Sequence, residues 1–178
     1  MALKATIFRA TLQIADLDRH YYHDHNLTLA RHPSETDTRM MVRLLAFCLH
    51  AHPALVFSKG LSTDDEPDLW QKDPAGSIEG WFELGQPDEK RLRKACGRAR
   101  KVVIYCYSGS SATIWWSQVQ QKLARFDNLS VINLDDEKVA ALQQLVQRNM
   151  QLHCTIQDAR VCLGDATQTV ELEPEHWK

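Results

Sequence analysis

The most informative stretch of this chain is Glu66-Pro67-Asp68, followed after a short interval by Glu83-Leu84-Gly85-Gln86. Each of these acidic clusters lies at the end of a strand-like segment, with a hairpin between the two segments. Carboxylates that converge at the edge of a sheet suit a hard cation such as Mg²⁺, which takes oxygen ligands and keeps several waters. The stretch therefore predicts a carboxylate site at a sheet edge, and a strongly basic segment follows it directly.

The composition is that of a globular protein. The chain has 178 residues, of which 44% are hydrophobic and 25% are charged, and this length is sufficient for one well-packed core. The formal net charge of −2 argues against a surface that binds polyanions everywhere, but it is compatible with a local basic strip. We expect a single domain that spans residues 1–178.

The cysteines and the apolar runs indicate a cytoplasmic protein. The 5 cysteines are scattered and lack CxxC or CxxH spacing, which is typical of reduced thiols rather than of a disulfide framework or a zinc site. The N-terminus has no apolar core with a cleavage pattern, and no run approaches the roughly 18 apolar residues of a membrane span. We predict a cytoplasmic location and no membrane contact.

Hydrophobic periodicity predicts the order of the elements. Strands are expected at residues 4–14, 20–31, 57–61, 78–85, 101–107, 129–134, 151–157, 160–164 and 168–172. Helices are expected from the cap Ser34 to His52-Pro53, from Pro87 onward, after the turn 108–111, and over residues 136–148. The helical crossover between the strands 101–107 and 129–134 predicts a parallel pair. The fold class is α+β, with a mixed central sheet, flanking helices and antiparallel strands added at both ends.

Glu83 is the most specific single candidate. It lies inside an apolar strand, shares a face with Trp81, and precedes Gly85 at the end of the strand. A buried carboxylate is costly unless it has a partner or a metal. Three interpretations stay open: Glu83 is a metal ligand, it is an exposed glutamate of an edge strand, or it pairs with an arginine.

Several long motifs resemble the YaeQ family of bacterial proteins. They cover nearly the whole chain: Met1-Ala2-Leu3-Lys4-Ala5-Thr6-Ile7, Leu29-Ala30-Arg31-His32-Pro33-Ser34-Glu35-Thr36, Asp64-Asp65-Glu66-Pro67, Glu83-Leu84-Gly85 with Pro87-Asp88, Ile114-Trp115-Trp116, and Leu134-Asp135-Asp136-Glu137. The resemblance implies a fold related to the PD-(D/E)xK nuclease superfamily, a restriction-endonuclease-like core with extra strands. It implies no settled biochemical activity.

The superfamily pattern implies roles for three acidic residues. Pro67-Asp68 matches the first half of the nuclease motif, Glu83 the second acid, and Glu35 the helix acid that some members use. We therefore predict a Mg²⁺ or Mn²⁺ ion held by Asp68 and Glu83, with Glu35 or Glu66 assisting. The other interpretation of Glu35 is a first-turn acid that serves the helix dipole, and an acidic run before a proline is also typical of a solvated turn.

The sequence departs from that pattern at Gly85, where the superfamily has a lysine. Such a lysine orients the attacking water and stabilises the charge that develops on phosphorus. Glycine does neither, and the prediction gives this role to Gln86 or Lys90. The substitution puts catalysis in doubt more than it does metal binding.

A run of seven cations without an acid follows the second acidic cluster: Lys90, Arg91, Arg93, Lys94, Arg98, Arg100 and Lys101. Lys90, Lys94, Arg98 and Lys101 fall on one face at helical spacing, opposite an apolar stripe. Because like charges repel, a compensating partner is expected, and the phosphates of a nucleic acid fit this role. The other interpretation is a solvated helix whose charges match its macrodipole.

Two functional hypotheses follow and stay open. The first is a Mg²⁺- or Mn²⁺-dependent, nuclease-like phosphodiesterase that acts on nucleic acid. The second is a non-catalytic module that binds nucleic acid or protein on the same scaffold, which the missing lysine and the acidic net charge favour. The sequence gives neither the substrate nor the oligomeric state.

Overall fold

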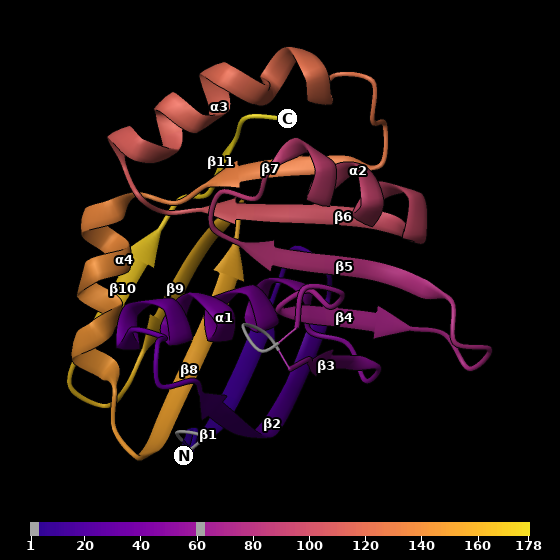
Figure 1. Ribbon diagram of the computed structural model, residues 1–178. Coiled ribbons are helices and arrows are strands. Elements are labelled where there is room, and N and C mark those ends of the chain that lie inside the picture. The colour runs from indigo at the N-terminus through magenta and orange to yellow at the C-terminus, as the bar shows by residue number, and fades with distance from the viewer. Residues whose placement is uncertain (1–3, 60–62) are drawn as a thin grey trace. The chain divides into compact units, whose positions relative to one another are not determined.

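The computed structural model describes residues 4–59 and 63–178, which form an α+β protein (Figure 1). Its helices are α1 (Asp37–His50), α2 (Glu89–Arg98), α3 (Ser110–Leu123) and α4 (Asp136–Leu142), followed by a short 3-10 helix, η2 (Gln143–Leu145). Its strands are β1 (Thr6–Asp16), β2 (Tyr21–Arg31), β3 (Leu55–Phe57), β4 (Leu69–Lys72), β5 (Ile78–Leu84), β6 (Ala99–Cys106), β7 (Leu129–Asn133), β8 (Asn149–Gln157), β9 (Arg160–Gly164), β10 (Thr169–Leu172) and β11 (Glu175–His176). No helix in these residues is long and apolar enough to cross a membrane.

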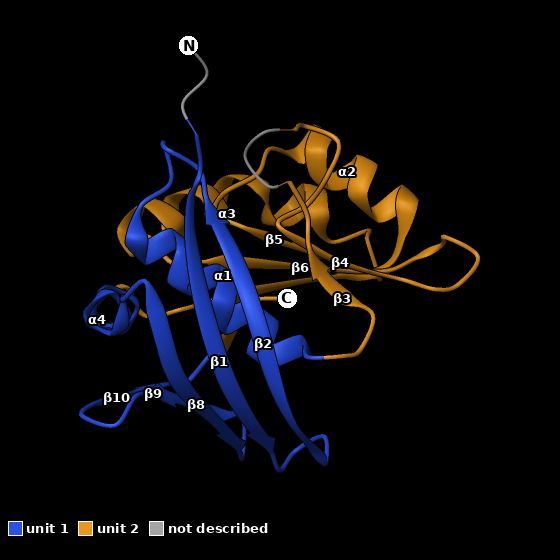
Figure 2. Cartoon of the chain, turned by 90° about the horizontal axis from the view of Figure 1, so that it is seen from below, with its two compact units in different colours: residues 1–51, 137–174 blue, residues 52–136, 175–178 orange. Residues whose placement is uncertain are grey.

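The chain groups into two compact units, each built on a mixed sheet (Figure 2). Unit 1 comprises residues 1–51 and 137–174, and unit 2 comprises residues 52–136 and 175–178. Unit 1 therefore combines the N-terminal segment with residues 137–174, and unit 2 combines the middle segment with the last four residues. The single domain expected over residues 1–178 stays a prediction.

The sheet of unit 1 has the strand order β10-β9-β8-β1-β2. The antiparallel pairs β1–β2 and β8–β9 join neighbours in sequence, whereas β1 and β8 pair in parallel across the length of the chain. The predicted strands at the two ends thus form one sheet of their own. Along β1 the buried side chains alternate with exposed ones, and Phe8, Leu12 and Ile14 are buried, as expected for a half-buried strand.

Two helix ends in unit 1 correct the sequence prediction. The cap of α1 is Thr36 rather than Ser34, because the Thr36 hydroxyl accepts a hydrogen bond from the Arg39 amide at 3.1 Å while Ser34 bonds to His32. The fourth predicted helix, residues 136–148, stops being α-helical at Leu142 and tightens into η2.

The sheet of unit 2 has the strand order β11-β7-β6-β5-β4-β3. Strands β5, β6 and β7 are parallel, with α2 and α3 as the crossovers, which confirms the predicted parallel pair of β6 and β7. Strands β3 and β4 extend the sheet in antiparallel fashion. The sequence prediction missed the short strand β4, whose four residues carry too little periodicity. The strand expected at residues 57–61 starts where β3 ends, and its last two residues lie outside the described ranges.

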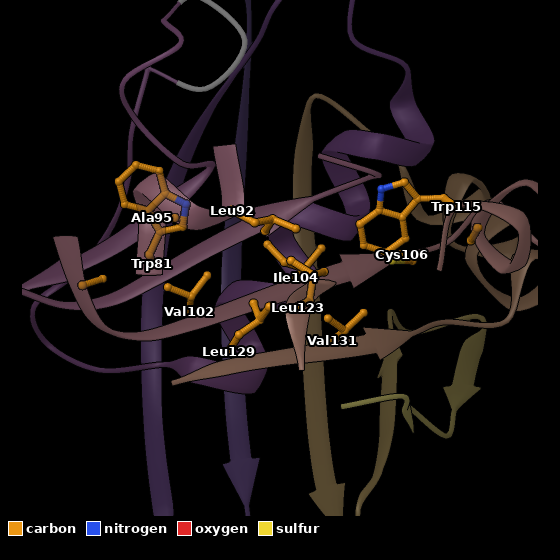
Figure 3. Packing of buried hydrophobic residues seen from close by; sticks show 12 residues of the cluster. Trp81, Leu92, Ala95, Val102, Ile104, Cys106, Trp115, Leu123, Leu129 and Val131 are labelled. Carbon is orange, nitrogen blue, oxygen red and sulfur yellow. The ribbon is translucent and has the colours of Figure 1, made fainter. Parts of the chain in front are cut away.

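The hydrophobic cluster of unit 2 lies between its sheet and the helices α2 and α3 (Figure 3). Small side chains on α2 and α3 let the helices approach the sheet closely, since Ala95 and Ala112 are fully buried. The cluster comprises Trp81, Leu92, Ala95, Ala99, Val102, Ile104, Cys106, Ala112, Trp115, Leu123, Leu129 and Val131. Because Leu92 and Ala95 of α2 are buried in this cluster, the opposite side of the helix faces solvent.

Candidate functional site

The structure brings Asp68 and Glu83 together at one end of the β4–β5 hairpin. Because Leu69 pairs with Phe82 in this antiparallel ladder, the residue before β4 lies beside the last residues of β5. The Asp68 carboxylate accepts a hydrogen bond from the Leu84 amide at 2.9 Å. Both residues are buried: Asp68 is 4% exposed and Glu83 is 6% exposed. Their role as metal ligands stays a prediction.

The Glu83 carboxylate is held by two donors of the protein. Trp81 Nε1 donates to one oxygen at 3.1 Å, and the Arg91 guanidinium donates to the other. Burial raises the pKa of Glu83, the hydrogen bond from Trp81 and the charge of Arg91 oppose this shift, and the negative charge of Asp68 adds to it. The structure shows the Glu83 carboxylate paired with an arginine. The interpretation as an exposed glutamate of an edge strand is wrong, because Glu83 is buried and β5 lies between β6 and β4.

Arg91 is the partner of Glu83 that the sequence did not single out. It lies in the first turn of α2, where Asp88 caps the helix by accepting a hydrogen bond from the Arg91 amide at 2.8 Å. Its side chain also donates to the backbone carbonyls of Asp64 and Glu66. The signal in the sequence was the position of Arg91 directly after the Glu83 strand, but seven neighbouring cations offered no means of choosing among them.

The acidic segment, residues 64–66, lies along one flank of α2. Lys94 forms an ion pair with Asp65, and Arg98 donates to the Asp65 carbonyl at 2.8 Å. These contacts lower the pKa of Asp65, chiefly through the hydrogen bond and the charge of Lys94. The Glu66 carboxylate accepts from the Lys59 amide at 3.2 Å, and its assistance to a metal stays a prediction.

The predicted basic face is divided in the structure. Helix α2 ends at Arg98, because Ala99 is extended and pairs with Ile78 as the first residue of β6. The placement of Lys101 on the helix is therefore wrong: Lys101 is an exposed residue of β6. Lys90, Lys94 and Arg98 do lie on the helix and are exposed. Within residues 4–59 and 63–178, no ion pair involves Lys90 or Arg93.

The proposed substitutes for the motif lysine do not contact Glu83. The Gln86 side chain bonds to the Ser111 hydroxyl at 3.0 Å, at the start of α3. Lys90 is exposed and lies in the first turn of α2. In the part of the chain that the structure describes, the side-chain donors to Glu83 are Trp81 and Arg91, so the roles of Gln86 and Lys90 in catalysis stay predictions.

Glu35 belongs to unit 1 and pairs with two arginines there. Arg39 donates to it at 3.0 Å, and Arg43 donates at 2.7 and 2.8 Å. It precedes the cap Thr36, so the expected position in the first turn of the helix is wrong. In the described ranges, no group of three or more His, Cys, Asp or Glu side chains is arranged to hold a metal ion, and the Mg²⁺ or Mn²⁺ site stays a prediction.

Gly85, at the position where the resemblance implies a lysine, has a backbone conformation that side chains disfavour. Its backbone φ is +100°, and no heavy atom lies within 4 Å of the position that a β-carbon would take there, so the obstacle is backbone strain and not lack of space. Side-chain-bearing residues reach such φ values at a cost of about 1–2 kcal/mol. The turn at the end of β5 therefore requires glycine.

We predict that Gly85→Lys and Gly85→Ala lower the free energy of unfolding by the same amount, about 1–2 kcal/mol, because both gain the strained β-carbon. Urea unfolding measures this loss. The control is Gly97→Ala in the last turn of α2, where nothing lies within 4 Å of an added β-carbon and a gain of up to about 0.5–1 kcal/mol is expected. A Gly85→Lys variant as stable as the wild type would contradict the argument.

Comparison with known proteins identifies close relatives over the whole chain. The family model described as YaeQ protein matches residues 1–174. The proteins named "Uncharacterized protein YaeQ" from Escherichia coli (strain K12) and Salmonella typhi are each 48% identical over 178 residues, covering 100% of this chain and 98% of the relative.

Two solved structures share the fold. The crystal structure of a YaeQ protein from Xanthomonas axonopodis pv. citri is 49% identical, with a TM-score of 0.95 and 98% of each chain covered. That of a YaeQ protein from Pseudomonas syringae is 30% identical, with a TM-score of 0.93, covering 98% of this chain and 96% of the other. The relation to the PD-(D/E)xK superfamily stays a prediction.

Proposed function

We propose that this chain, which belongs to the YaeQ family, is a nucleic-acid-binding protein whose helix α2 contacts the phosphate backbone. One observation carries the proposal: the solvent side of α2 displays exposed cations at almost every position, including Lys90, Arg93, Lys94 and Arg98. Its other side is fixed by burial of Leu92 and Ala95. A rigid helix with one cationic face suits a polyanion because binding releases the counterions of the phosphates.

The length of α2 matches a short stretch of backbone. Ten helical residues span about 15 Å, and one strand of a nucleic acid carries a phosphate about every 3.4 Å of helix rise. Lys90 and Arg93 can contact a phosphate without breaking an ion pair of the described residues, while Lys94 and Arg98 contact the acidic segment. Phosphates therefore compete with Asp65 for the second pair of cations. The net charge of −2 confines binding to this strip.

Hydrolysis of the bound strand is a second candidate function, supported by the adjacent buried carboxylates of Asp68 and Glu83. Two carboxylates, waters and a substrate phosphate form a typical Mg²⁺ environment. A cation held there would supply an activated water. The Arg91 side chain on Glu83 and the glycine at position 85 count against this candidate, so binding without hydrolysis is the function that we propose.

Fluorescence anisotropy with labelled oligonucleotides tests the proposal. Replacement of Lys90 and Arg93 by alanine is expected to weaken binding at least tenfold and to reduce the slope of log affinity against log salt by about two, one for each lost phosphate contact. The matched control is Lys4→Ala with Arg160→Ala, the same change of charge on exposed residues of unit 1. An equal loss in the control, or no binding by the wild type, would overturn the proposal.

The same mixtures, incubated with and without Mg²⁺ or Mn²⁺, test hydrolysis on a denaturing gel. We expect no metal-dependent cleavage by the wild type. Cleavage that Glu83→Gln abolishes would establish the second candidate, and equal cleavage by both proteins would reveal a contaminating nuclease.

Asp65→Asn serves as the converse variant in the binding assay, because release of Lys94 should tighten binding about two- to fivefold.

A further inference from the structure

We infer that the nucleic acid bound at α2 is single-stranded and that the indole of Trp70 stacks on one of its bases. This inference rests on the proposed function and names the class of its ligand. It is carried by the face of the sheet beside α2, where three residues of β3 and β4 form a surface that we call the β3–β4 platform: Val56, Trp70 and Lys72.

The platform continues the sheet face that α2 covers. In the ladders of unit 2, Val56 pairs with Trp70, Trp70 with Trp81, and Trp81 with Val102. Residues directly opposite each other in a sheet project to the same face. Trp81 and Val102 are buried in the cluster with α2, whereas Val56 is 50% exposed and Trp70 is half-buried. The same face is thus covered at β5 and β6 and partly open at β3 and β4.

Figure 1 shows the same arrangement, with α2 over the middle of the sheet and with β3 and β4 at its edge. An exposed valine beside a partly exposed tryptophan offers an apolar surface. Such a surface beside a cationic helix is the combination used by proteins that grip single strands, in which cations follow the backbone and aromatic rings take the bases.

Cations already lie at the ring of Trp70 and at that of its neighbour Trp81. Lys72 Nζ is 3.7 Å from the centre of the Trp70 ring, and the Arg98 guanidinium is 5.2 Å from that of Trp81. The two indoles are 6.4 Å apart and nearly perpendicular. Lys72 is exposed, so its ammonium can leave the ring for a phosphate at little cost and return the indole face to a base. Arg98 lies between the platform and α2, since it belongs to the helix and its guanidinium lies over Trp81, which pairs with Trp70.

The preference for a single strand follows from the part of the nucleic acid that Trp70 contacts, a base, and the part that α2 contacts, the phosphates. Inside a duplex the faces of the bases are covered by their neighbours, so an indole reaches them only after unstacking. The cations of α2 contact phosphates, which single strands and duplexes share. Trp70 therefore distinguishes the two forms, and it favours an unpaired base.

Titration of the full chain with labelled 20-nucleotide oligo(dT), oligo(U) and a DNA duplex of equal length tests the inference. Wild type is expected to prefer the single strands. Trp70→Ala should weaken single-strand binding about fivefold to a hundredfold, the range for loss of one base–aromatic stack, and leave duplex binding unchanged. Trp70→Phe should retain most of the affinity. The DNA and RNA arms identify which single strand is preferred.

Two further measurements separate stacking from a loss of structure. Trp116→Ala is the matched control, since Trp116 is half-buried on α3 and stacks on Trp177, and it should leave single-strand binding unchanged. Oligo(dT) should quench part of the tryptophan fluorescence of the wild type, and this quenching should be largely absent in Trp70→Phe. Circular dichroism verifies that each variant is folded.

The outcomes distinguish this inference from the proposed function. Equal binding of single strands and duplex, with no effect of Trp70→Ala, would overturn the inference and leave the function of α2 standing. An equal loss in Trp70→Ala and Trp116→Ala would also overturn it. Absence of binding to all three oligonucleotides would overturn the proposed function and the inference together.

Discussion

Replacement of Arg91 by alanine is expected to lower the free energy of unfolding by about 2–3 kcal/mol at pH 7, because it leaves the buried Glu83 carboxylate without its cation. Loss of a partner from a fully buried pair costs about 3–5 kcal/mol, and we expect less because 27% of the Arg91 side chain is exposed. The variant also loses the two bonds to the carbonyls of the acidic segment. Urea unfolding at pH 7 measures the loss.

The effect of Arg91→Ala should depend on pH in a defined direction. The pKa of Glu83 is already raised above the ordinary value of 4.5, so the folded protein holds this proton more tightly than the unfolded chain. The bound proton therefore stabilises the folded protein fully below pH 4.5, and this stabilisation is lost as the pH rises through the raised pKa of Glu83. Removal of Arg91 raises the pKa further, and the destabilisation should shrink when unfolding is measured at about pH 5 instead of pH 7.

Two companion variants make this prediction specific. Arg91→Ala combined with Glu83→Gln should recover much of the loss, since no charge is then buried. Lys94→Ala removes another cation from the same flank of α2, but its partner Asp65 is exposed, so little change is expected. A loss in Arg91→Ala that is independent of pH and not recovered in the double variant would show that Glu83 is not its source.

Replacement of Glu35 by alanine should have the largest effect in unit 1, a loss of about 3–5 kcal/mol. The side chains of Glu35 and Arg43 are 2% and 5% exposed, and Arg43 donates twice to this carboxylate. The variant leaves the arginine buried without its counter-charge. Thermal unfolding followed by circular dichroism, together with urea unfolding, measures the change.

The comparison of Glu35→Gln with Glu35→Ala separates a structural from a metal-binding role. Glutamine keeps one acceptor oxygen for Arg43, so we expect it to lose less stability than alanine. Both variants should bind oligonucleotides like the wild type once folded. Stability of Glu35→Ala equal to that of the wild type, or thermal stabilisation of the wild type by Mn²⁺ that this variant lacks, would contradict the structural role.

Local pattern was sufficient for most of the elements of this protein. Alternation along β1 and β8, the apolar stripe of α2 and the buried runs of β6 and β7 each report a period that a strand or helix imposes on its own residues. The parallel pair β6–β7 followed from the helix between the strands. Strand β4 escaped because its period is too short to detect, and the parallel pairing of β1 with β8 escaped because it joins residues from opposite ends of the chain.

The candidate site divides in the same way. The acidic clusters were placed at one sheet edge from their spacing alone, and the contact of Asp68 with Leu84 agrees with that placement. The partner of Glu83 was out of reach, since the seven cations from Lys90 to Lys101 are equivalent in sequence. Which of them turns toward Glu83 depends on the rotation of α2, and burial of Leu92 and Ala95 sets that rotation.

The α+β class, the family, the adjacent acidic clusters and the cationic helix could be inferred from the sequence, because each depends on contiguous residues or on their period. Three features depend on the folded chain: Arg91 neutralises Glu83, the acidic segment contacts Lys94 and Arg98, and Trp70 pairs with the strand residue that α2 covers. The physical reason is that a charge or a ring acts through its neighbours in space, and packing of the apolar side chains chooses those neighbours.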